Sequence, residues 1–282
     1  LTFSKMHGIG NDYIYINCFQ ETVTDPEKLS IFMSNVRFGV GSDGLVLILP
    51  SEVADFRMRI FNADGSEAMM CGNATRCVGK YVYEHGMTDK TEVSLETNSG
   101  IKYLTLYVNE ATNKVDAVKV DMGKAILKPA EIPVADDGDR FIAKPVVVDG
   151  VSYDMTCVSM GNPHAVVFLP EIDSLDLEKM GPSFEHHPLF PNRVNTEFIR
   201  VIDDHTLQMR VWERGSGETF ACGTGACAAA VASVLNGYCK REQEILIHLR
   251  GGDLRIIYHN DESVTMIGPA TFIFEGKMEY PV

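Results

Sequence analysis

Two short stretches, MMCGNATRC (Met69–Cys77) and FACGTGACA (Phe220–Ala228), each place a cysteine and a glycine at the expected start of a helix. The two cysteines, Cys71 and Cys222, are 151 residues apart. A glycine directly after the cysteine lets another molecule approach the backbone closely. The repetition of this step indicates either two copies of one structural unit or two strand-turn-helix segments that are similar by coincidence.

Further matches at the same spacing favour the repeat. Gly10-Asn11 aligns with Gly161-Asn162, and MRIF at 58–61 aligns with MRVW at 209–212. Five of the sixteen positions from 58 to 73 are identical to their partners 151 residues later. Several short matches at a single spacing are typical of an internal repeat, so we predict two copies of one unit.

Each copy has the same order of elements. An alternating apolar strand is followed by a strand that ends in a Gly/Ser/Asp turn, then by the Cys-Gly step, a helix and further alternating strands. Gly86 and Gly237 are placed to end the two helices. The second helix, GACAAAVASVLNG, is apolar on almost every side, so we expect it to be buried inside its lobe.

The predicted fold class is α+β, with two pseudo-repeated lobes that each curl a mixed β-sheet around a central buried helix. We expect an N-terminal lobe at residues 1–122 and a C-terminal lobe at residues 123–268. A closing strand within 269–282 is expected to return to the first lobe. The active site is predicted to lie between the lobes, because each lobe supplies one Cys-Gly step.

The composition argues against several classes of function. The net charge of −14 repels phosphate backbones, so nucleic-acid binding is not expected. No apolar run approaches the roughly 20 residues that span a bilayer. The first residues, LTFSKMHGIGNDY, contain one lysine and no apolar core, which argues against a signal peptide and favours a cytoplasmic location.

The cysteine count argues against a disulfide framework, because seven is an odd number in a long chain without a secretion signal. No pair has the spacing of a zinc ribbon, and no histidine pair completes a ligand set, so we expect no metal. The five cysteines outside the Cys-Gly steps are expected to be small buried side chains. They are Cys18, Cys77, Cys157, Cys227 and Cys239.

The position of Cys71 and Cys222 at helix starts has chemical consequences. A helix N-terminus offers unpaired backbone N–H groups and the positive end of the helix dipole, which lower the pKa of a cysteine and favour a bound carboxylate. If the two lobes face each other, the two sulfurs lie on opposite sides of one α-carbon. A thiolate and a thiol so placed can invert a stereocentre without a cofactor, one removing a proton and the other delivering one.

Six motifs together resemble the signature segments of diaminopimelate epimerases, and they extend over essentially the whole chain. They are MHGIGNDYIYIN, FGVGSDG, FNADGSEAMMCGN, SMGNPHAVVF, NTEFI and ERGSGETFACGTGACA. The resemblance implies a cofactor-independent isomerase that interconverts L,L- and meso-diaminopimelate, without pyridoxal phosphate, in lysine and cell-wall precursor biosynthesis. The Cys-Gly segments alone point only to the wider group of two-cysteine racemases.

The resemblance implies Cys71 and Cys222 as the acid/base pair, and it implies that His164 and Glu213 influence the pKa of these thiols. It also implies that the backbone at Gly72-Asn73 and Gly223-Thr224 binds the reacting carboxylate. The side chains that it implies for substrate binding are Asn11, Asn62, Asn162, Asn195, Glu213 and Arg214.

Arg214 and Glu213 suit the second, non-reacting amino-acid head of diaminopimelate. A guanidinium can fork onto its carboxylate, and a side-chain carboxylate can accept from its ammonium. Two positions depart from the family pattern: Ala74 replaces a frequent glycine, and Gly44 stands where some members carry an amide. We therefore assign no substrate contact to Gly44.

Two other functions stay open. A two-cysteine racemase of another amino acid would leave Arg214 and Glu213 unpaired, which is costly in a buried site. A thiol redox protein, in which Cys71 and Cys222 form a disulfide, would have no need of the Asn, Glu and Arg set. For the epimerase we expect a small amino-acid substrate, a homodimer, and no cofactor, metal, nucleic acid or membrane partner.

Overall fold

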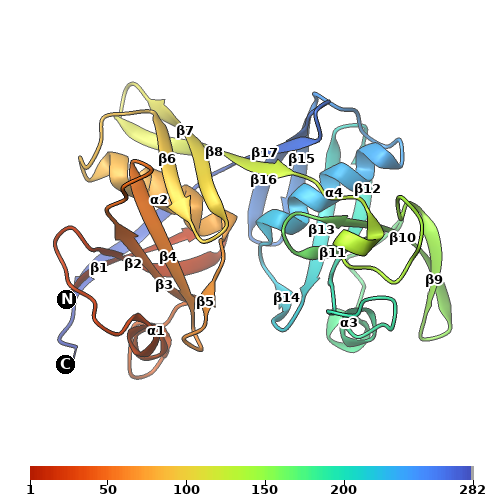
Figure 1. The fold of residues 1–282 in the computed structure, drawn as a ribbon, viewed down its shortest axis with the longest axis horizontal. Coiled ribbons are helices and arrows are strands. Elements are labelled where there is room, and N and C mark those ends of the chain that lie inside the picture. Colours follow the sequence, from red (N-terminus) through yellow and green to blue (C-terminus); the bar gives the residue numbers. More distant parts are fainter. Residues whose placement is uncertain (281–282) are drawn as a thin grey trace. The chain divides into compact units, whose positions relative to one another are not determined.

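The structure, a computed structural model, describes residues 1–280, which divide into two compact units (Figure 1). Unit 1 comprises residues 1–121 and the C-terminal residues from 267 onward, and unit 2 comprises residues 122–266. The chain passes from one unit to the other within two strands, β8 (Lys114–Lys124) and β17 (Ser263–Gly268).

Unit 1 is a mixed β-sheet with two helices, α1 (Pro26–Ser34) and α2 (Gly72–Glu84). Its neighbouring strands are β18, β1, β2, β3, β4, β6, β7 and β8, with the short β5 beside β4. The pairs β2–β3 and β4–β6 are parallel, and the other pairs are antiparallel. The strands are β1 (Thr2–Gly8), β2 (Asn11–Asn17), β3 (Gly44–Leu49), β4 (Phe56–Asn62), β5 (Glu67–Ala68), β6 (Glu92–Thr97), β7 (Gly100–Asn109) and β18 (Thr271–Lys277).

Unit 2 repeats this plan with α3 (Leu177–Glu185) and α4 (Gly223–Leu235), and it adds a 3-10 turn, η1 (Pro129–Glu131). Its strand order is β9, β10, β11, β12, β13, β15 and β16, with β14 beside β13, and the pairs β11–β12 and β13–β15 are parallel. The strands are β9 (Lys144–Val148), β10 (Val151–Ser159), β11 (Pro163–Phe168), β12 (Asn195–Asp203), β13 (Thr206–Glu213), β14 (Gly217–Thr219), β15 (Glu244–Leu249) and β16 (Gly252–Tyr258).

The predicted repeat is confirmed at the level of single residues. Helices α1 and α3 begin and end 151 residues apart, and so do α2 and α4. The strand register is also kept: Ile14 pairs with Leu45 in unit 1, and the residues 151 positions later, Ala165 and Thr196, pair in unit 2. The two α+β units are therefore copies of one fold and not segments that are alike by coincidence.

Helix α4 is buried, as its apolar composition predicts. Residues Ala226 to Ala232 are all fully enclosed, and the helix packs against β10, β11, β12, β15 and β16. Small alanine side chains let a sheet approach from several directions, so a helix without a polar face is stable there. The helix ends at Asn236, and Gly237 follows with a positive φ of 80°. Gly86, with a φ of 67°, ends α2 in the same way.

The sequence did not predict α1 and α3, although each begins at a capping aspartate. The side chains of Asp25 and Asp176 accept from the backbone N–H of Lys28 and Lys179. Both helices have only nine residues, and α3 contains Pro182, a residue that argues against a helix interior. Within residues 1–280, no helix is long and apolar enough to span a membrane.

Candidate active site

Cys71 and Cys222 each occupy the N-cap position of a helix, α2 and α4. Their backbones are extended, with φ and ψ of −141° and 120° for Cys71 and of −130° and 106° for Cys222. The first helical hydrogen bonds, from Thr75 to Cys71 and from Ala226 to Cys222, are both 2.9 Å long. The preceding N–H groups of each helix therefore have no partner within their own helix.

The hairpin that leads to each cysteine is fixed by a bidentate ion pair. Arg59 on β4 forks onto Glu67 on β5 at 2.8 and 2.9 Å, and Arg210 on β13 forks onto Glu218 on β14 at 2.8 and 3.0 Å. These pairs are 151 residues apart. Because a planar guanidinium–carboxylate pair fixes both direction and distance, it holds the strand end four residues before each cysteine.

In unit 1, the side chain of Asn11 lies between Cys71 and Asp43. Its amide nitrogen donates to Asp43 Oδ2 at 2.7 Å, which leaves Oδ1 to accept from Cys71 Sγ at 3.4 Å and from Asn73 Nδ2 at 3.2 Å. A carboxylate only accepts, so Asp43 determines which way the amide points. Asn11 is therefore oriented with its carbonyl oxygen toward the thiol.

Arg76 and Tyr13 complete this Cys71 cluster, whose members are Asn11, Tyr13, Asp43, Cys71, Asn73 and Arg76. Arg76 is fully buried and donates to Asn73 Oδ1 at 2.8 Å, to the carbonyl of Gly72 at 3.3 Å and to that of Pro269 at 3.0 Å. Burial raises the pKa of Tyr13, and the neighbouring Cys71 and Asp43 raise it further. The cluster thus contains a buried cation at the first turn of α2.

In unit 2, Cys222 is more deeply buried than Cys71 and makes different contacts. Its sulfur accepts from the backbone N–H of Gly225 at 3.3 Å and lies 3.6 Å from Thr224 Oγ1. Burial raises the pKa of Cys222 well above its usual value, and Glu213 and Glu197 raise it further. The prediction that the helix N-terminus lowers this pKa is wrong for Cys222, because burial and two carboxylates outweigh the hydrogen bonds from Thr224 and from the N–H of Gly225.

His164 is fully buried beside Cys222 and bonds at both ring nitrogens. Nδ1 lies 2.7 Å from Glu197 Oε1, and Nε2 lies 3.0 Å from Asn162 Oδ1. The amide of Asn162 in turn donates to Thr224 Oγ1 at 3.3 Å. These residues, with Cys222, form the Cys222 cluster: Asn162, His164, Glu197, Cys222 and Thr224.

Asn195 and Arg214 are linked to this cluster through the backbone. Asn195 is buried and donates to the carbonyl of Pro163 at 2.8 Å, while its own Oδ1 accepts from the N–H of Arg214 at 2.9 Å. Arg214 donates one side-chain hydrogen bond within residues 1–280, to the carbonyl of Asn192 at 3.0 Å. Asn195 therefore ties the strand of His164 to the turn that carries Arg214.

Two further predicted residues make contacts in the hairpin turns. Asn62 donates to Ser66 Oγ at 3.0 Å, across the turn between β4 and β5. Glu213 accepts from Thr219 Oγ1 at 2.5 Å, across the corresponding turn between β13 and β14. At Gly44, a Cβ would lie 2.0 Å from the carbonyl oxygen of Phe61, so this backbone has no room for a side chain at this position.

Four members of the two clusters were not predicted as site residues: Tyr13, Asp43, Arg76 and Glu197. Asp43 and Glu197 stand inside quoted motifs, GSDG and NTEFI, but nothing local marks them as partners of Asn11 and His164. A signal was present in the repeat, because Glu197 corresponds to the apolar Val46 of unit 1. A carboxylate at a position that is apolar in the other copy indicates that unit 2 needs a polar group there.

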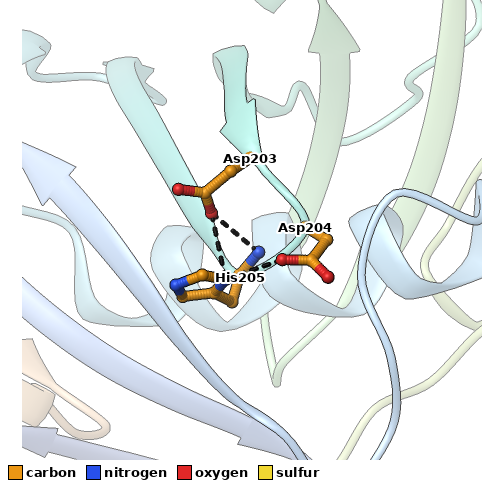
Figure 2. A group of neighbouring side chains, drawn as sticks. All are labelled: Asp203, Asp204 and His205. Carbon is orange, nitrogen blue, oxygen red and sulfur yellow. Dashed lines mark hydrogen bonds and ion pairs between the residues drawn. The ribbon is translucent and has the colours of Figure 1, made fainter.

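A separate group of potential metal ligands lies in the turn between β12 and β13. Figure 2 shows Asp203, Asp204 and His205, with His205 Nδ1 2.7 Å from Asp204 Oδ1 and 3.2 Å from Asp203 Oδ1. All three side chains are exposed, and Asp203 also accepts from the backbone N–H of His205. The geometry is that of a hydrogen-bonded turn.

The two clusters contain buried charged side chains of opposite sign. The Cys71 cluster contains the cation of Arg76, whereas the Cys222 cluster contains Glu197 beside His164. Position 76 corresponds to Cys227 in unit 2, and position 13, a tyrosine, corresponds to His164. The repeated fold thus carries two thiols in chemically different surroundings.

Comparison with known proteins shows the family of the chain. The family model described as diaminopimelate epimerase matches residues 3–128 and 156–273. Among similar proteins, a diaminopimelate epimerase of Acetivibrio thermocellus is 58% identical over 99% of both chains. One of Agathobacter rectalis is 55% identical over 99% of both, and one of Methanococcus maripaludis is 52% identical over 99% of this chain and all of its own.

Solved structures with low sequence identity share the fold. A probable proline racemase from Agrobacterium radiobacter superposes with a TM-score of 0.73 at 14% identity, over 99% of this chain and 93% of its own. A phenazine biosynthesis protein from Bacillus anthracis gives 0.69 at 17% identity, over 99% of both chains. These two likenesses concern the fold alone, whereas the family model and the sequence relatives agree over nearly the full length. The chain belongs to the diaminopimelate epimerase family.

Proposed function

We propose that the chain interconverts L,L- and meso-diaminopimelate by two-base proton transfer, with Cys71 and Cys222 each serving one face of the α-carbon. The observation that carries the proposal is the repeated N-cap cysteine, each with its own set of polar neighbours, in a chain whose relatives are named for this reaction. The reaction belongs to lysine and cell-wall precursor biosynthesis.

The proton transfers balance without a cofactor. The thiolate of one cysteine takes the α-proton and becomes a thiol, while the thiol of the other gives its proton to the opposite face and becomes a thiolate. The raised pKa of Cys222 supports a resting thiol at this position. When Cys222 delivers the proton, Cys71 is the base that removes one from the other face, and the reverse reaction exchanges the two roles.

The α-carboxylate is proposed to bind at the helix starts. The first N–H groups of α2, at Gly72 and Asn73, and of α4, at Gly223 and Thr224, have no partner inside their helices. Such groups, with the positive end of the dipole, stabilise the negative charge that develops on the carboxylate and α-carbon as the proton leaves. Glycine at the first position removes the side chain that would block approach.

Arg214 and Glu213 are proposed to bind the distal amino-acid head. The Arg214 guanidinium has five donors, and only the bond to Asn192 is made within residues 1–280. The remaining donors suit a second carboxylate, and Asn195 fixes the backbone from which they extend. Asn11, Asn62 and Asn162 are proposed as further substrate contacts.

Deuterium exchange tests the proposal. Purified, reduced protein in deuterated water is expected to incorporate solvent deuterium at the α-carbon of L,L-diaminopimelate and to form the meso isomer. Cys71→Ala and Cys222→Ala should each abolish epimerisation. Cys18→Ala and Cys239→Ala, which remove a thiol outside the two clusters in each unit, serve as matched controls.

Either of two results would overturn the two-base proposal. One is near-normal epimerisation by Cys71→Ala or Cys222→Ala in protein that is folded. The other is exchange with a different amino acid in preference to diaminopimelate, which would point to another two-cysteine racemase. A homodimer and a cytoplasmic location stay predictions, and light scattering on the purified protein tests the first.

A further inference from the structure

Glu197 on β12 is a fully buried carboxylate with one side-chain hydrogen bond. Its Oε1 lies 2.7 Å from Nδ1 of His164, which is also fully buried. No group within residues 1–280 hydrogen-bonds its second oxygen, Oε2. A buried carboxylate usually satisfies both oxygens, because an unpaired one costs free energy. The position of Glu197 is therefore not explained by its own hydrogen bonding.

A continuous chain of hydrogen bonds connects Glu197 to the thiol of Cys222. From His164 it continues through Nε2 to Asn162 Oδ1 at 3.0 Å, and from Asn162 Nδ2 to Thr224 Oγ1 at 3.3 Å. Thr224 Oγ1 lies 3.6 Å from Cys222 Sγ. Each link joins two side chains of unit 2, so the chain depends on the internal packing of this unit alone.

The directions of the bonds made by Asn162 and His164 follow from the chemistry of the groups. The amide nitrogen of Asn162 donates to Thr224, so its oxygen faces His164 and can only accept. Nε2 must then donate, which places one shared proton between Nδ1 and Glu197 Oε1. The oxygen of Asn162 therefore requires the proton at Nε2, while the carboxylate of Glu197, bonded to Nδ1, fixes the orientation of the ring.

A second contact brings Glu197 close to Cys222 directly. A Cβ added at Gly225 would lie 2.6 Å from Glu197 Oε1 and 3.1 Å from Cys222 Sγ. The carboxylate oxygen and the sulfur are thus packed against the same glycine in the first turn of α4. The carboxylate of Glu197 is consequently a near neighbour of the Cys222 thiol.

The other copy of the fold shows that this pair is not needed to build the unit. The positions of His164 and Glu197 correspond to Tyr13 and Val46 in unit 1, where both are buried. The strands that carry them pair in the same register in both units. Since a buried ion pair often stabilises less than apolar residues of similar volume, its presence in unit 2 calls for a reason beyond folding.

We propose that Glu197 is a positioning residue for the acid/base cysteine of unit 2: it fixes the ring of His164 and, through Asn162 and Thr224, the hydrogen-bonded chain that ends at Cys222. This inference rests on the proposed function. Glu197 does not touch the substrate, so it acts on the proton transfer through His164.

Glu197→Gln keeps the size of the side chain and removes its charge. We expect the rate of α-proton exchange to fall about 10- to 100-fold, the effect of losing one hydrogen bond to a charged group. We also expect alkylation of Cys222 by iodoacetamide, followed by peptide mapping, to begin at a lower pH, because the negative neighbour of the thiol is gone. Alkylation needs no substrate and no turnover.

Glu84→Gln is the matched control, because the carboxylate of Glu84 in unit 1, on a side chain that is 5% exposed, pairs with Lys80 and Lys114. It removes a comparable charge, yet it should leave the Cys222 alkylation curve and the pH profile of exchange unchanged. Combining Glu197→Gln with His164→Asn gives a sharper test. If Glu197 acts through His164, the double variant loses no more activity than His164→Asn alone.

An unchanged alkylation curve together with an unchanged exchange profile in Glu197→Gln would overturn the inference, and so would losses that add in the double variant. If Glu197→Gln does not fold, Glu197→Asp, which withdraws the carboxylate from His164, takes its place, and wild-type exchange by that variant would overturn the inference equally. Absence of exchange in the wild-type protein would instead refute the proposed function, while the alkylation curves would still test the role of Glu197.

Discussion

Replacement of Gly225 by alanine tests how tightly Glu197 and Cys222 are packed. The added Cβ would lie 2.6 Å from Glu197 Oε1, whereas ordinary contacts begin at 3.4 Å, and it would lie 3.1 Å from both Cys222 Sγ and Met209 Cε. The methyl end of Met209 can rotate away. The carboxylate of Glu197 has to move by about 0.8 Å, and the 2.7 Å bond to His164 opposes that movement.

The expected change in the free energy of unfolding follows from two opposing contributions, helix propensity and overpacking. Alanine favours a helix over glycine by up to about 1 kcal/mol. Overpacking of a buried site costs about 1–3 kcal/mol, and a weakened hydrogen bond to a charged group adds to that cost. We therefore expect Gly225→Ala to lower the free energy of unfolding by about 1–2 kcal/mol and to reduce α-proton exchange about 10- to 100-fold.

Urea unfolding and the exchange assay measure these two effects. Ala74 occupies the equivalent position of unit 1 and is fully buried, so Ala74→Gly removes the helix-propensity gain together with one buried methyl group, a loss of about 1–2 kcal/mol. The reasoning would be refuted by a Gly225→Ala protein that is stabilised, as propensity alone predicts, and that exchanges the α-proton at the wild-type rate. Such a result would mean that the carboxylate of Glu197 can move away from the added methyl group without weakening its bond to His164.

Arg214→Lys keeps the positive charge but loses the planar fork of the guanidinium. The catalytic efficiency with diaminopimelate should therefore fall roughly 30- to 1,000-fold. An equal fall with a substrate that lacks the distal amino-acid head would count against the substrate assignment. The rate of Cys222 alkylation in the wild-type protein should keep rising above pH 9, since burial beside Glu213 and Glu197 raises its pKa well above 9.0, and a plateau below that pH would contradict the resting thiol. Burial would raise the pKa of Glu218, but the hydrogen bonds and charge of Arg210 outweigh burial and lower it. The ionised carboxylate therefore stabilises the folded protein above the usual carboxyl pKa. This stabilisation is lost when acidification lowers the pH through the folded-state pKa of Glu218. Glu218→Gln should therefore reduce the loss of urea-measured stability on acidification below the usual carboxyl pKa of about 4.3, and an unchanged slope would argue against this pair as the support of the hairpin.

The repeat and its element order were determined by the sequence, because their signals are local. The Cys-Gly step, the glycines at 86 and 237, and the strand that breaks into a turn each act within a few residues, and they recur at one spacing. An α+β fold with two copies followed from these signals. Helices α1 and α3 escaped prediction because each has only nine residues, and Pro182 inside α3 is a residue that usually interrupts a helix.

The surroundings of the two cysteines were decided only by tertiary structure. His164 and Glu197 are 33 residues apart and meet because the parallel pairing of β11 and β12 places Val166 opposite Glu197 and His164 opposite Asn195. Arg76 reaches Pro269 across 193 residues of chain. A helix N-terminus by itself lowers the pKa of a thiol, but the fold buries Cys222 beside two carboxylates and reverses the sign. Sequence places a residue at a helix start, whereas its charge state depends on which distant side chains the sheet register brings to it.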